Sequence, residues 1–456
     1  MDQFFLRREP FGGVIYYVAE GRLKFLNHTG FEICFGLSQG WLDDEIIAHV
    51  ESRFQVDDAR VVRSDIEYIR ETLLHPASWN KKHAVAVGAD PGSIPTLSAP
   101  LEIHWEITGR CNLKCHHCYN NSVAASPQPS LEQIRSVVDE LKAAKIKTRG
   151  IIVSGGEPLM HRRLREILEL IRPLAAEVVL ATNGTLVSES NIGWIAAMVD
   201  AVNLSVDSSS TADFAKFRGN PQVLEKVLNA LRLFDKHGTP VIAQTTVSRY
   251  NIDALDDLAL LLKSEGAASW IIRMPLAMGR ARAHEQDFLT WQEAEAKEPL
   301  FQRIKDTYTS KFNALHIGNR FMWSYKEPFV SDDQKTGLAS CAAGTMLATI
   351  RSDGTMVPCA IFGDTTNPEV HSRPVWNGRF LSEWRNAQCF KTMREINLAR
   401  ITPCSNCSKL PDVCDAGCRA LAFNTFGSVY DADPGCNYVR TLRSGQQAPP
   451  VDCRMG

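Results

Sequence analysis

The chain has no cysteine between Cys118 and Cys341, although it contains 13 cysteines in 456 residues. It also lacks any apolar run long enough for a signal peptide or a membrane span. We therefore expect a cytoplasmic protein with no membrane partner. Thiols stay reduced in that compartment, so this many cysteines indicates metal or cluster ligands rather than disulfides.

An excess of positive charge is also missing. The formal net charge is −2, from 50 Lys and Arg against 52 Asp and Glu. Residues 1–80 are acidic, with eight Lys and Arg against thirteen Asp and Glu. A domain that reads nucleic acid is normally basic, so we expect no nucleic-acid partner. With 44% hydrophobic and 22% charged residues, the composition is that of a globular protein of two or three domains.

The first 80 residues are predicted to form a small domain of strands followed by helices. Short β-type runs over 14–18 and 23–26 flank a hairpin signal at Gly21. Three helices are predicted after the hairpin, over residues 29–36, 41–54 and 64–74, the last opening on a capping box at Ser64. This order resembles a winged helix-turn-helix unit. Residues 81–98, which include several Pro, Gly and Ala, are predicted to be a linker.

Strands and helices alternate over residues 99–310. Six strands are predicted, over residues 101–107, 150–153, 178–181, 202–206, 241–247 and 270–274. The helical patterns between them indicate a parallel α/β sheet, either open or a partial barrel. Ligands of such folds gather at the carboxyl ends of the strands, and a loop with Cys111, Cys115 and Cys118 directly follows the first strand.

The C-x3-C-x2-C spacing of this loop supplies three thiolates from one short segment. A [4Fe–4S] cluster has four irons, so three cysteines leave one iron free to bind another ligand. The alternative is a zinc site, which would need a fourth protein ligand such as His104, His116 or His117. The ring of His117 could also pack on a purine, and Tyr119 follows the last cysteine.

Further polar groups stand at the ends of the later strands. The second strand ends in Ser154-Gly155-Gly156-Glu157-Pro158, whose glycines would let the backbone approach a ligand closely. Other candidates at or after strand ends are Asn183, Ser205, Asp207 and Arg218. Each alone is by default a turn, a cap or a surface ion pair, but several together indicate a shared pocket.

The cysteine spacing, Gly155-Gly156-Glu157-Pro158 and the α/β pattern of residues 99–280 resemble the radical S-adenosylmethionine (SAM) superfamily. The resemblance implies a partial (β/α)6 TIM-like barrel and a [4Fe–4S] cluster on Cys111, Cys115 and Cys118. SAM would bind the open iron and be cleaved to a 5′-deoxyadenosyl radical that abstracts hydrogen from a substrate. The cofactor-binding residues implied for SAM are His117, Tyr119, Gly155, Gly156, Glu157, Asn183, Ser205, Asp207 and Arg218.

The cysteines of residues 311–456 resemble the SPASM extension of peptide-modifying radical SAM enzymes, with six residues instead of five between Cys407 and Cys414. The resemblance implies two auxiliary [4Fe–4S] clusters. One would use Cys404, Cys407, Cys414 and Cys436. The other would use Cys341, Cys359 and Cys418, with its fourth ligand open among Cys389, Cys453, a substrate thiolate or none. A zinc ribbon would fit only the Cys404-x2-Cys407 pair.

The N-terminal block resembles the peptide-recognition domain of ribosomal peptide maturation systems, on residues such as Leu26-Asn27-His28-Thr29. Such domains bind a leader peptide as an added strand on a sheet edge. An inert accessory domain is the alternative.

Together these features predict a sactisynthase-like radical SAM/SPASM maturase of a ribosomally made peptide. The expected reaction is hydrogen abstraction from a core residue and an oxidative crosslink, first of all a Cys thioether. Carbon–carbon crosslinking, backbone excision, and modification of a protein residue or small molecule remain alternatives, as does a zinc-bearing binding module without catalysis. The expected partners are the precursor peptide, held through its leader, and an electron donor such as flavodoxin or ferredoxin.

Overall fold

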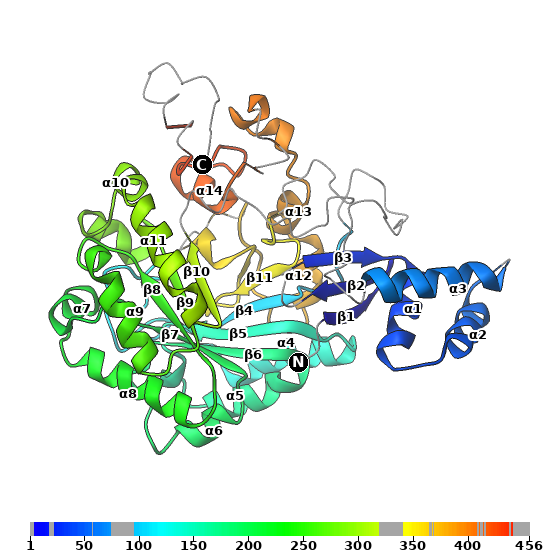
Figure 1. Cartoon of the computed structure of the whole chain (residues 1–456), viewed down its shortest axis with the longest axis horizontal. Coiled ribbons are helices and arrows are strands. Elements are labelled where there is room, and N and C mark those ends of the chain that lie inside the picture. The colour runs from blue at the N-terminus through cyan, green and yellow to red at the C-terminus, as the bar shows by residue number, and fades with distance from the viewer. Residues whose placement is uncertain are drawn as a thin grey trace. The chain divides into compact units, whose positions relative to one another are not determined.

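The computed structural model describes residues 4–17, 22–56, 58–73, 95–318, 341–363, 367, 369–407, 410, 414, 416–436 and 439–440. The chain divides into two compact units (Figure 1). The first comprises Met1–Ser98, Glu327–Ala342 and Arg394–Asn397, and the second comprises Ala99–Lys326, Ala343–Met393 and Leu398–Gly456. Among the described residues, no helix is both long and apolar enough to cross a bilayer.

The first unit consists of three antiparallel strands followed by three helices. The strands are β1 (Phe4–Glu9), β2 (Gly12–Tyr17) and β3 (Arg22–Leu26), in the order β1-β2-β3. The helices are α1 (His28–Ser38), α2 (Asp43–Arg53) and α3 (Ala59–Tyr68), the last continued by a π-helical turn over Ile69–Leu73. The predicted hairpin is confirmed as β2 and β3. β1 was not predicted, because two phenylalanines, a leucine and then charged residues give no alternating pattern.

The capping box predicted at Ser64 is wrong. The Asp58 side chain accepts a hydrogen bond from the Arg60 N–H, and α3 begins directly after Asp58, so Ser64 lies inside the helix. An aspartate two residues before the first free N–H is a strong helix start, which the Ser64 pattern obscured.

A buried carboxylate joins the sheet of this unit to two of its helices. Glu32 of α1 is 1% exposed and accepts hydrogen bonds from Arg8 of β1, from His49 Nε2 at 3.0 Å and from Arg53 Nη1 at 3.1 Å. Burial alone would raise the pKa of Glu32, but the hydrogen bonds and positive charges lower that pKa to about 2. Glu32 is therefore ionised and fixes the first three elements of secondary structure around it.

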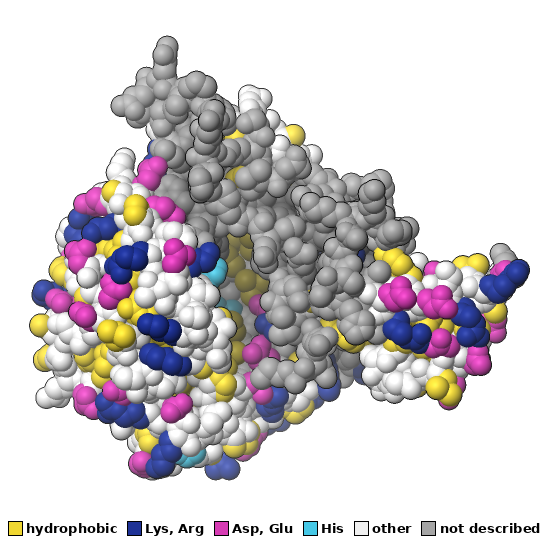
Figure 2. All heavy atoms as spheres, viewed as in Figure 1, with side chains coloured by type: hydrophobic (Ala, Val, Ile, Leu, Met, Phe, Trp, Pro, Cys, Tyr) yellow, Lys and Arg dark blue, Asp and Glu magenta, His cyan; other side chains and the backbone are white. Residues whose placement is uncertain are grey.

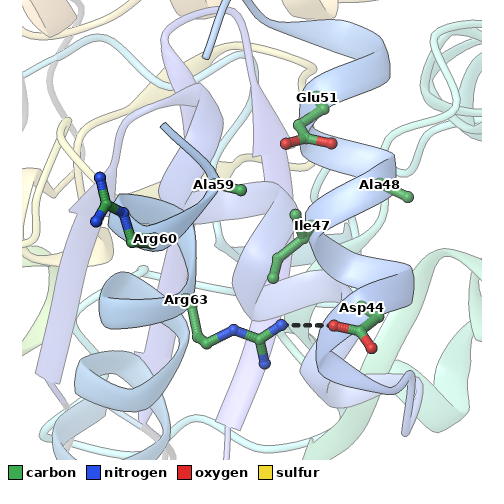
Figure 3. A pocket seen from close by; sticks show the side chains of 7 residues that line it. All are labelled: Asp44, Ile47, Ala48, Glu51, Ala59, Arg60 and Arg63. Carbon is green, nitrogen blue, oxygen red and sulfur yellow. Dashed lines mark hydrogen bonds and ion pairs between the residues drawn. The ribbon is translucent and has the colours of Figure 1, made fainter. Parts of the chain in front are cut away.

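A shallow pocket lies between α2 and α3 (Figure 3). It is lined by Asp44, Ile47, Ala48, Glu51, Ala59, Arg60 and Arg63. An ion pair between Arg63 Nη2 and Asp44 Oδ1, 2.5 Å apart, crosses it. Acidic and basic side chains are interspersed over these helices (Figure 2). The pocket therefore favours no ligand of one charge.

The second unit is built on one nine-stranded sheet in the order β10-β9-β8-β7-β6-β5-β4-β11-β12. Its strands are β4 (Glu102–Thr108), β5 (Thr148–Gly155), β6 (Ala175–Thr182), β7 (Ala201–Ser205), β8 (Val241–Thr246), β9 (Ser269–Arg273), β10 (Ala314–Gly318), β11 (Leu347–Ile350) and β12 (Met356–Val357). β4 to β10 are parallel, which confirms the six predicted strands and adds a seventh.

Helices connect the parallel strands and lie along the outside of the sheet (Figure 1). They are α4 (Leu131–Ala143), α5 (Leu164–Ile171), α6 (Ile192–Ala196), α7 (Thr211–Arg218), α8 (Val223–Lys236), α9 (Leu255–Ser264), α10 (Trp291–Ala296) and α11 (Glu298–Tyr308). The later helices are α12 (Phe380–Asn386), α13 (Gln388–Arg394) and α14 (Arg419–Phe426).

The strands bury one face against these helices and present a polar face on the other side. On β4, Ile103, Trp105 and Ile107 are fully buried, while His104 and Glu106 alternate with them and point the opposite way. We call the face that carries His104 and Glu106 the inner face of the sheet. All the parallel strands end at the same edge, so the loops after them meet there.

The first part of the predicted cysteine-rich tail joins the main sheet. The predicted turn at Ser352-Asp353-Gly354 is confirmed, and it connects β11 to the antiparallel β12. β11 pairs in parallel with β4, the strand that precedes the cysteine loop. The predicted domain limits at 80, 98 and 310 stay predictions.

We predict that Glu32→Gln weakens the first unit by about 2 kcal/mol, because charge-assisted hydrogen bonds to a buried carboxylate are lost. Hydrogen exchange of the α1 amides and urea unfolding of the full chain measure this. The lowered pKa means that the wild-type contribution is complete above about pH 4.3 and disappears as the pH falls to about 2. Glu51→Gln, at an exposed position of α2, is the control. Equal effects of the two substitutions would contradict the role of Glu32.

Candidate functional site

The cysteine loop is held in place by two glycines at the end of β5. The N–H of Gly156 donates to the carbonyl of Thr108 at 2.8 Å, and that of Glu157 donates to the carbonyl of Arg110 at 2.7 Å. A Cβ on Gly155 would lie 2.0 Å from the Thr108 oxygen, and one on Gly156 would lie 2.3 Å from the Arg110 oxygen. Here the predicted close approach is to the loop of the chain itself.

A second segment holds the loop from another direction. Arg280 donates from its N–H to the carbonyl of Cys118 (2.9 Å) and from its guanidinium to the carbonyls of Cys115 (3.0 Å) and Ser122 (2.7 Å). A Cβ on Gly279 would lie 2.3 Å from the Tyr119 oxygen. The sequence gave no signal for this contact, because it uses backbone oxygens and a glycine with no recognisable motif.

The thiols of the loop lie in a buried, hydrogen-bonded environment. Burial raises the pKa of Cys111 to about 11, and the neighbouring thiols and Glu157 raise it further, against a hydrogen bond from the Leu113 N–H to Sγ at 3.4 Å. Burial likewise raises the pKa of Cys115, whose Sγ accepts from Arg218 Nη1 at 3.4 Å. Thiolates at these positions therefore need a bound cation to stabilise them.

The spacing of the three sulfurs fits a cluster better than a single ion. Among the described residues, the metal-binding atoms that lie within 4.8 Å of one another in a group of three belong to His116, His284 and Asp287. The three cysteines form no such group. Zn–S bonds of about 2.3 Å place the sulfurs of one zinc site roughly 3.8 Å apart. The loop therefore suits a larger body with several metals, and the residues fit a [4Fe–4S] cluster.

A buried ion pair lies beside the middle cysteine. The guanidinium of Arg218 donates to Asp207 Oδ2 from Nε (2.7 Å) and Nη2 (2.5 Å), and Asp207 Oδ1 accepts from the Thr246 N–H (2.9 Å). The His117 ring stacks on Phe217 at 4.2 Å, and its Nε2 lies 3.9 Å from Asp207. Burial lowers the pKa of His117 to about 3, so the ring is neutral. Its buried Nδ1 has no hydrogen-bond partner among the described residues.

The carboxylate of Glu157 is used within the protein. It accepts from the Thr182 hydroxyl (2.7 Å), the Asn183 N–H (2.8 Å) and the Leu159 N–H (3.1 Å). The side chain is fully buried, and burial raises its pKa. Glu157 therefore ties the end of β5 to the end of β6 and orients the backbone beside the cysteine loop.

Two further predicted residues separate at this edge. Asn183 donates to Asn112 Oδ1 at 3.0 Å, and its Nδ2 lies 4.0 Å from Cys111 Sγ. Ser205 ends β7 and pairs with Gln244 through the strand ladder, outside the hydrogen-bonded group around the cysteines. The structure thus brings Asn183 to the loop but leaves Ser205 without a contact there.

Tyr119 and Glu106 form a buried polar group on the inner face. Burial raises the pKa of Glu106 to about 7, although the Asn120 side chain and the Ser352 N–H donate to it and favour its charged form. Burial also raises the pKa of Tyr119, and the charges of Glu106 and Cys359 act on it in the same direction. The predicted auxiliary ligand Cys359 therefore lies within electrostatic reach of the cysteine loop.

His116, proposed above as a possible zinc ligand, instead takes part in a hydrogen-bonded brace. Its Nδ1 lies 2.8 Å from Asp287 Oδ2, and its ring stacks on His284 at 3.8 Å and 9°. The Tyr250 hydroxyl donates to Asp287 Oδ1 at 2.7 Å. Parallel rings point their lone pairs side by side rather than toward one metal, and both carboxylate oxygens are already bonded. We therefore assign this group to positioning the loop.

Four tail cysteines predicted to share a cluster lie near one another. Burial raises the pKa of Cys404 to about 12, and three thiols that raise it further belong to Cys436, Cys414 and Cys407. Cys341, Cys359 and Cys418 are partly buried and Cys389 is buried. Cys453 lies outside the described residues. Cys34, which had no predicted role, is buried in the apolar core of the first unit.

We predict that Gly156→Ala destabilises the second unit by about 1–3 kcal/mol, because its Cβ would meet the Arg110 carbonyl at 2.3 Å and displace the cysteine loop. Gly150→Ala on the same strand is the control, since its Cβ would meet only the Glu177 oxygen at 4.0 Å. Thermal unfolding measures both. A Gly156→Ala protein as stable as Gly150→Ala would show that the loop is not held by this contact.

Known proteins resemble this chain in both sequence and fold. Residues 105–262 match the family model of the Radical SAM superfamily. The AdoMet-dependent heme synthase of Methanosarcina barkeri is 29% identical over 360 residues, covering 76% of this chain and 98% of that protein. The mycofactocin maturase MftC of Mycobacterium ulcerans is 26% identical over 348 residues, covering 75% of this chain and 88% of that protein.

A solved structure shares the fold over nearly the whole chain. Streptococcus suis SuiB bound to S-adenosylmethionine superposes with a TM-score of 0.68 at 16% identity, covering 96% of this chain and 99% of that one. SuiB has also been solved bound to its precursor peptide SuiA. Residues 105–262 of the present chain therefore form a radical SAM domain, and the chain is an enzyme related to peptide-modifying maturases.

Proposed function

We propose that this enzyme matures a ribosomally made peptide by forming an oxidative crosslink, first of all a Cys thioether. The observation that carries the proposal is the cysteine loop, held at the carboxyl edge of a parallel sheet with sulfurs spaced for a cluster. A radical SAM domain and relatedness to peptide maturases support the same reading. The chain is an enzyme, so a zinc-bearing binding module without catalysis is set aside.

The residues around the loop would hold the cofactors as follows. Cys111, Cys115 and Cys118 would bind the cluster, with Arg218 and backbone N–H groups stabilising the thiolates. When bound, the cluster and SAM supply the electron and the 5′-deoxyadenosyl radical that takes a hydrogen atom from the substrate. The residues that would border SAM are His117, Tyr119, Gly155, Gly156, Glu157, Asn183, Ser205, Asp207 and Arg218.

The geometry divides these roles between ligand contact and support. The carboxylates of Glu157 and Asp207 are already hydrogen-bonded within the protein, so they would orient the backbone and Arg218 rather than bind SAM directly. The neutral ring of His117 keeps one buried nitrogen without a protein partner among the described residues, which suits a purine neighbour. The inner face next to Tyr119 would receive the substrate.

Thioether formation removes two hydrogens and two electrons from the peptide. The hydrogen atom from carbon would go to 5′-deoxyadenosine, the thiol proton to solvent, and the second electron to an acceptor. Cys404, Cys407, Cys414 and Cys436 would bind one auxiliary cluster for that electron, and Cys341, Cys359 and Cys418 a second. Flavodoxin or ferredoxin would supply the reducing electron.

The N-terminal unit would bind the leader of the precursor. β1 and β3 each pair only with β2 among the described residues, so each has a free edge to which an extended peptide could add as a strand. The acidic balance of residues 1–80 favours a leader with basic residues.

Modification of a small molecule is the second candidate. It is favoured by the heme synthase of M. barkeri, which is related to this chain over 76% of its length. Crosslinking through carbon–carbon bonds and backbone excision would use the same peptide site.

We predict that replacing Cys111, Cys115 and Cys118 by Ala abolishes the release of 5′-deoxyadenosine from SAM by the reduced, reconstituted enzyme. Chromatography of the reaction mixture measures this. Iron content and visible absorption should fall only in part, because the tail cysteines are untouched. Cys34→Ala, in the core of the other unit, should keep full activity. Cleavage that persists in the triple variant would refute the assignment.

We predict that a short precursor encoded beside this gene loses two hydrogens per crosslink when it is incubated with the enzyme, SAM and reductant. Mass spectrometry with thiol alkylation measures this, since a thioether removes one alkylatable Cys. Modification of a precursor that contains no Cys would exclude the thioether and favour carbon–carbon closure or excision. SAM cleavage stimulated by a small molecule and by no peptide would favour the second candidate.

A further inference from the structure

Arg273 stands at the carboxyl end of β9, on the inner face of the sheet. Trp270 and Ile272 of the same strand are buried on the helix side, where the Trp270 indole donates to the Thr245 hydroxyl at 2.9 Å. Side chains alternate along a strand, so Arg273 lies on the opposite face. Its carbonyl accepts from the Val247 N–H at 2.8 Å, which fixes the backbone at the strand end.

The surroundings of Arg273 are polar but uncharged. Its positive charge lowers the pKa of His104, which burial and this charge bring to about 4, and also that of His316. Tyr119 is the remaining group whose charge acts on it. β9 and β4 are separated by four strands in the sheet, so an interaction between Arg273 and His104 means that the sheet curves and gathers these side chains.

Arg273 differs from the other arginines of the described chain in lacking compensation for its burial. Burial lowers the pKa of two of them, Arg7 and Arg273. Arg7 has a partner, because its Nε donates to Glu9 at 2.7 Å. Arg273 makes no hydrogen bond or ion pair through its guanidinium within the described residues. A desolvated cation without an acceptor is costly, and an anion that arrives with a ligand would remove that cost.

We propose that Arg273 binds a carboxylate of the substrate and thereby positions it beside the cysteine loop. A guanidinium offers two parallel N–H donors to a carboxylate, which gives both affinity and orientation. The carboxylate would be an Asp or Glu side chain or the C-terminus of a core peptide, or an acid group of a small molecule. The inference rests on the proposed radical chemistry at this site but not on the peptide nature of the substrate.

SAM carries a carboxylate too, but the geometry favours the substrate as the partner. Arg273 acts on Tyr119, which follows Cys118, whereas Arg218 and Asp207 lie against Cys115. The two arginines therefore serve different sides of the loop. The test separates these two sources of carboxylate.

The first experiment needs no knowledge of the substrate. Sodium propionate and the neutral propionamide are added to the reconstituted, SAM-loaded enzyme, and binding is followed by saturation-transfer NMR. Propionate should bind and propionamide should not, and Arg273→Gln should remove the difference. Arg162→Gln, at an exposed arginine with no recorded ion pair, should keep it. No preference for propionate in the wild type, or a preference that survives Arg273→Gln, would overturn the proposal.

The second experiment measures turnover. For a precursor with its carboxylates free, Arg273→Gln should lower kcat/KM by about ten- to a hundredfold, mostly through KM, with partial rescue by Arg273→Lys. For the amidated precursor the substitution should change little. SAM affinity should stay within about twofold, and a loss confined to SAM would assign Arg273 to the cofactor instead. If no peptide is turned over by any variant, the peptide function fails, while the propionate result still decides the role of Arg273.

Discussion

The arrangement of the site depends on the close packing of backbone against backbone around the cysteine loop. Gly155 and Gly156 touch the loop where it leaves β4, and Gly279 touches it just after Cys118. A side chain at any of these positions would collide with a carbonyl oxygen. Three thiols on a short loop can hold a cluster in one orientation only if the loop itself cannot move. The sheet, the Glu157 bridge and the Arg280 hydrogen bonds all serve that constraint.

Much of this unit could be predicted because its signals are local. Apolar runs separated by helical patterns identified the six parallel strands, and the spacing of three cysteines after the first strand identified the loop. The ion pair of Arg218 with Asp207, the brace of His116 on Asp287 and the clamp by Gly279 and Arg280 could not be predicted. They join residues far apart in the sequence, and only the folded sheet brings them together.

The helix start at Asp58 shows a different limit. Two patterns competed there, and the Ser64 capping box was chosen over a lone aspartate that in fact caps α3. The pairing of β11 with β4 was also missed, since a four-residue strand carries no mark of its partner. Charge, in contrast, is distributed with a clear logic: buried Glu32, Asp207 and Glu157 are all satisfied within the protein, and Arg273 is left for a ligand.

The central claim is that Cys111, Cys115 and Cys118 hold a cluster with one iron open to SAM. It is tested most directly by electron paramagnetic resonance of the dithionite-reduced enzyme in which the tail cysteines Cys404, Cys407 and Cys414 are replaced by Ala. The account predicts a reduced [4Fe–4S] signal whose g values shift when SAM is added. A signal that does not respond to SAM, or a colourless zinc protein, would contradict it.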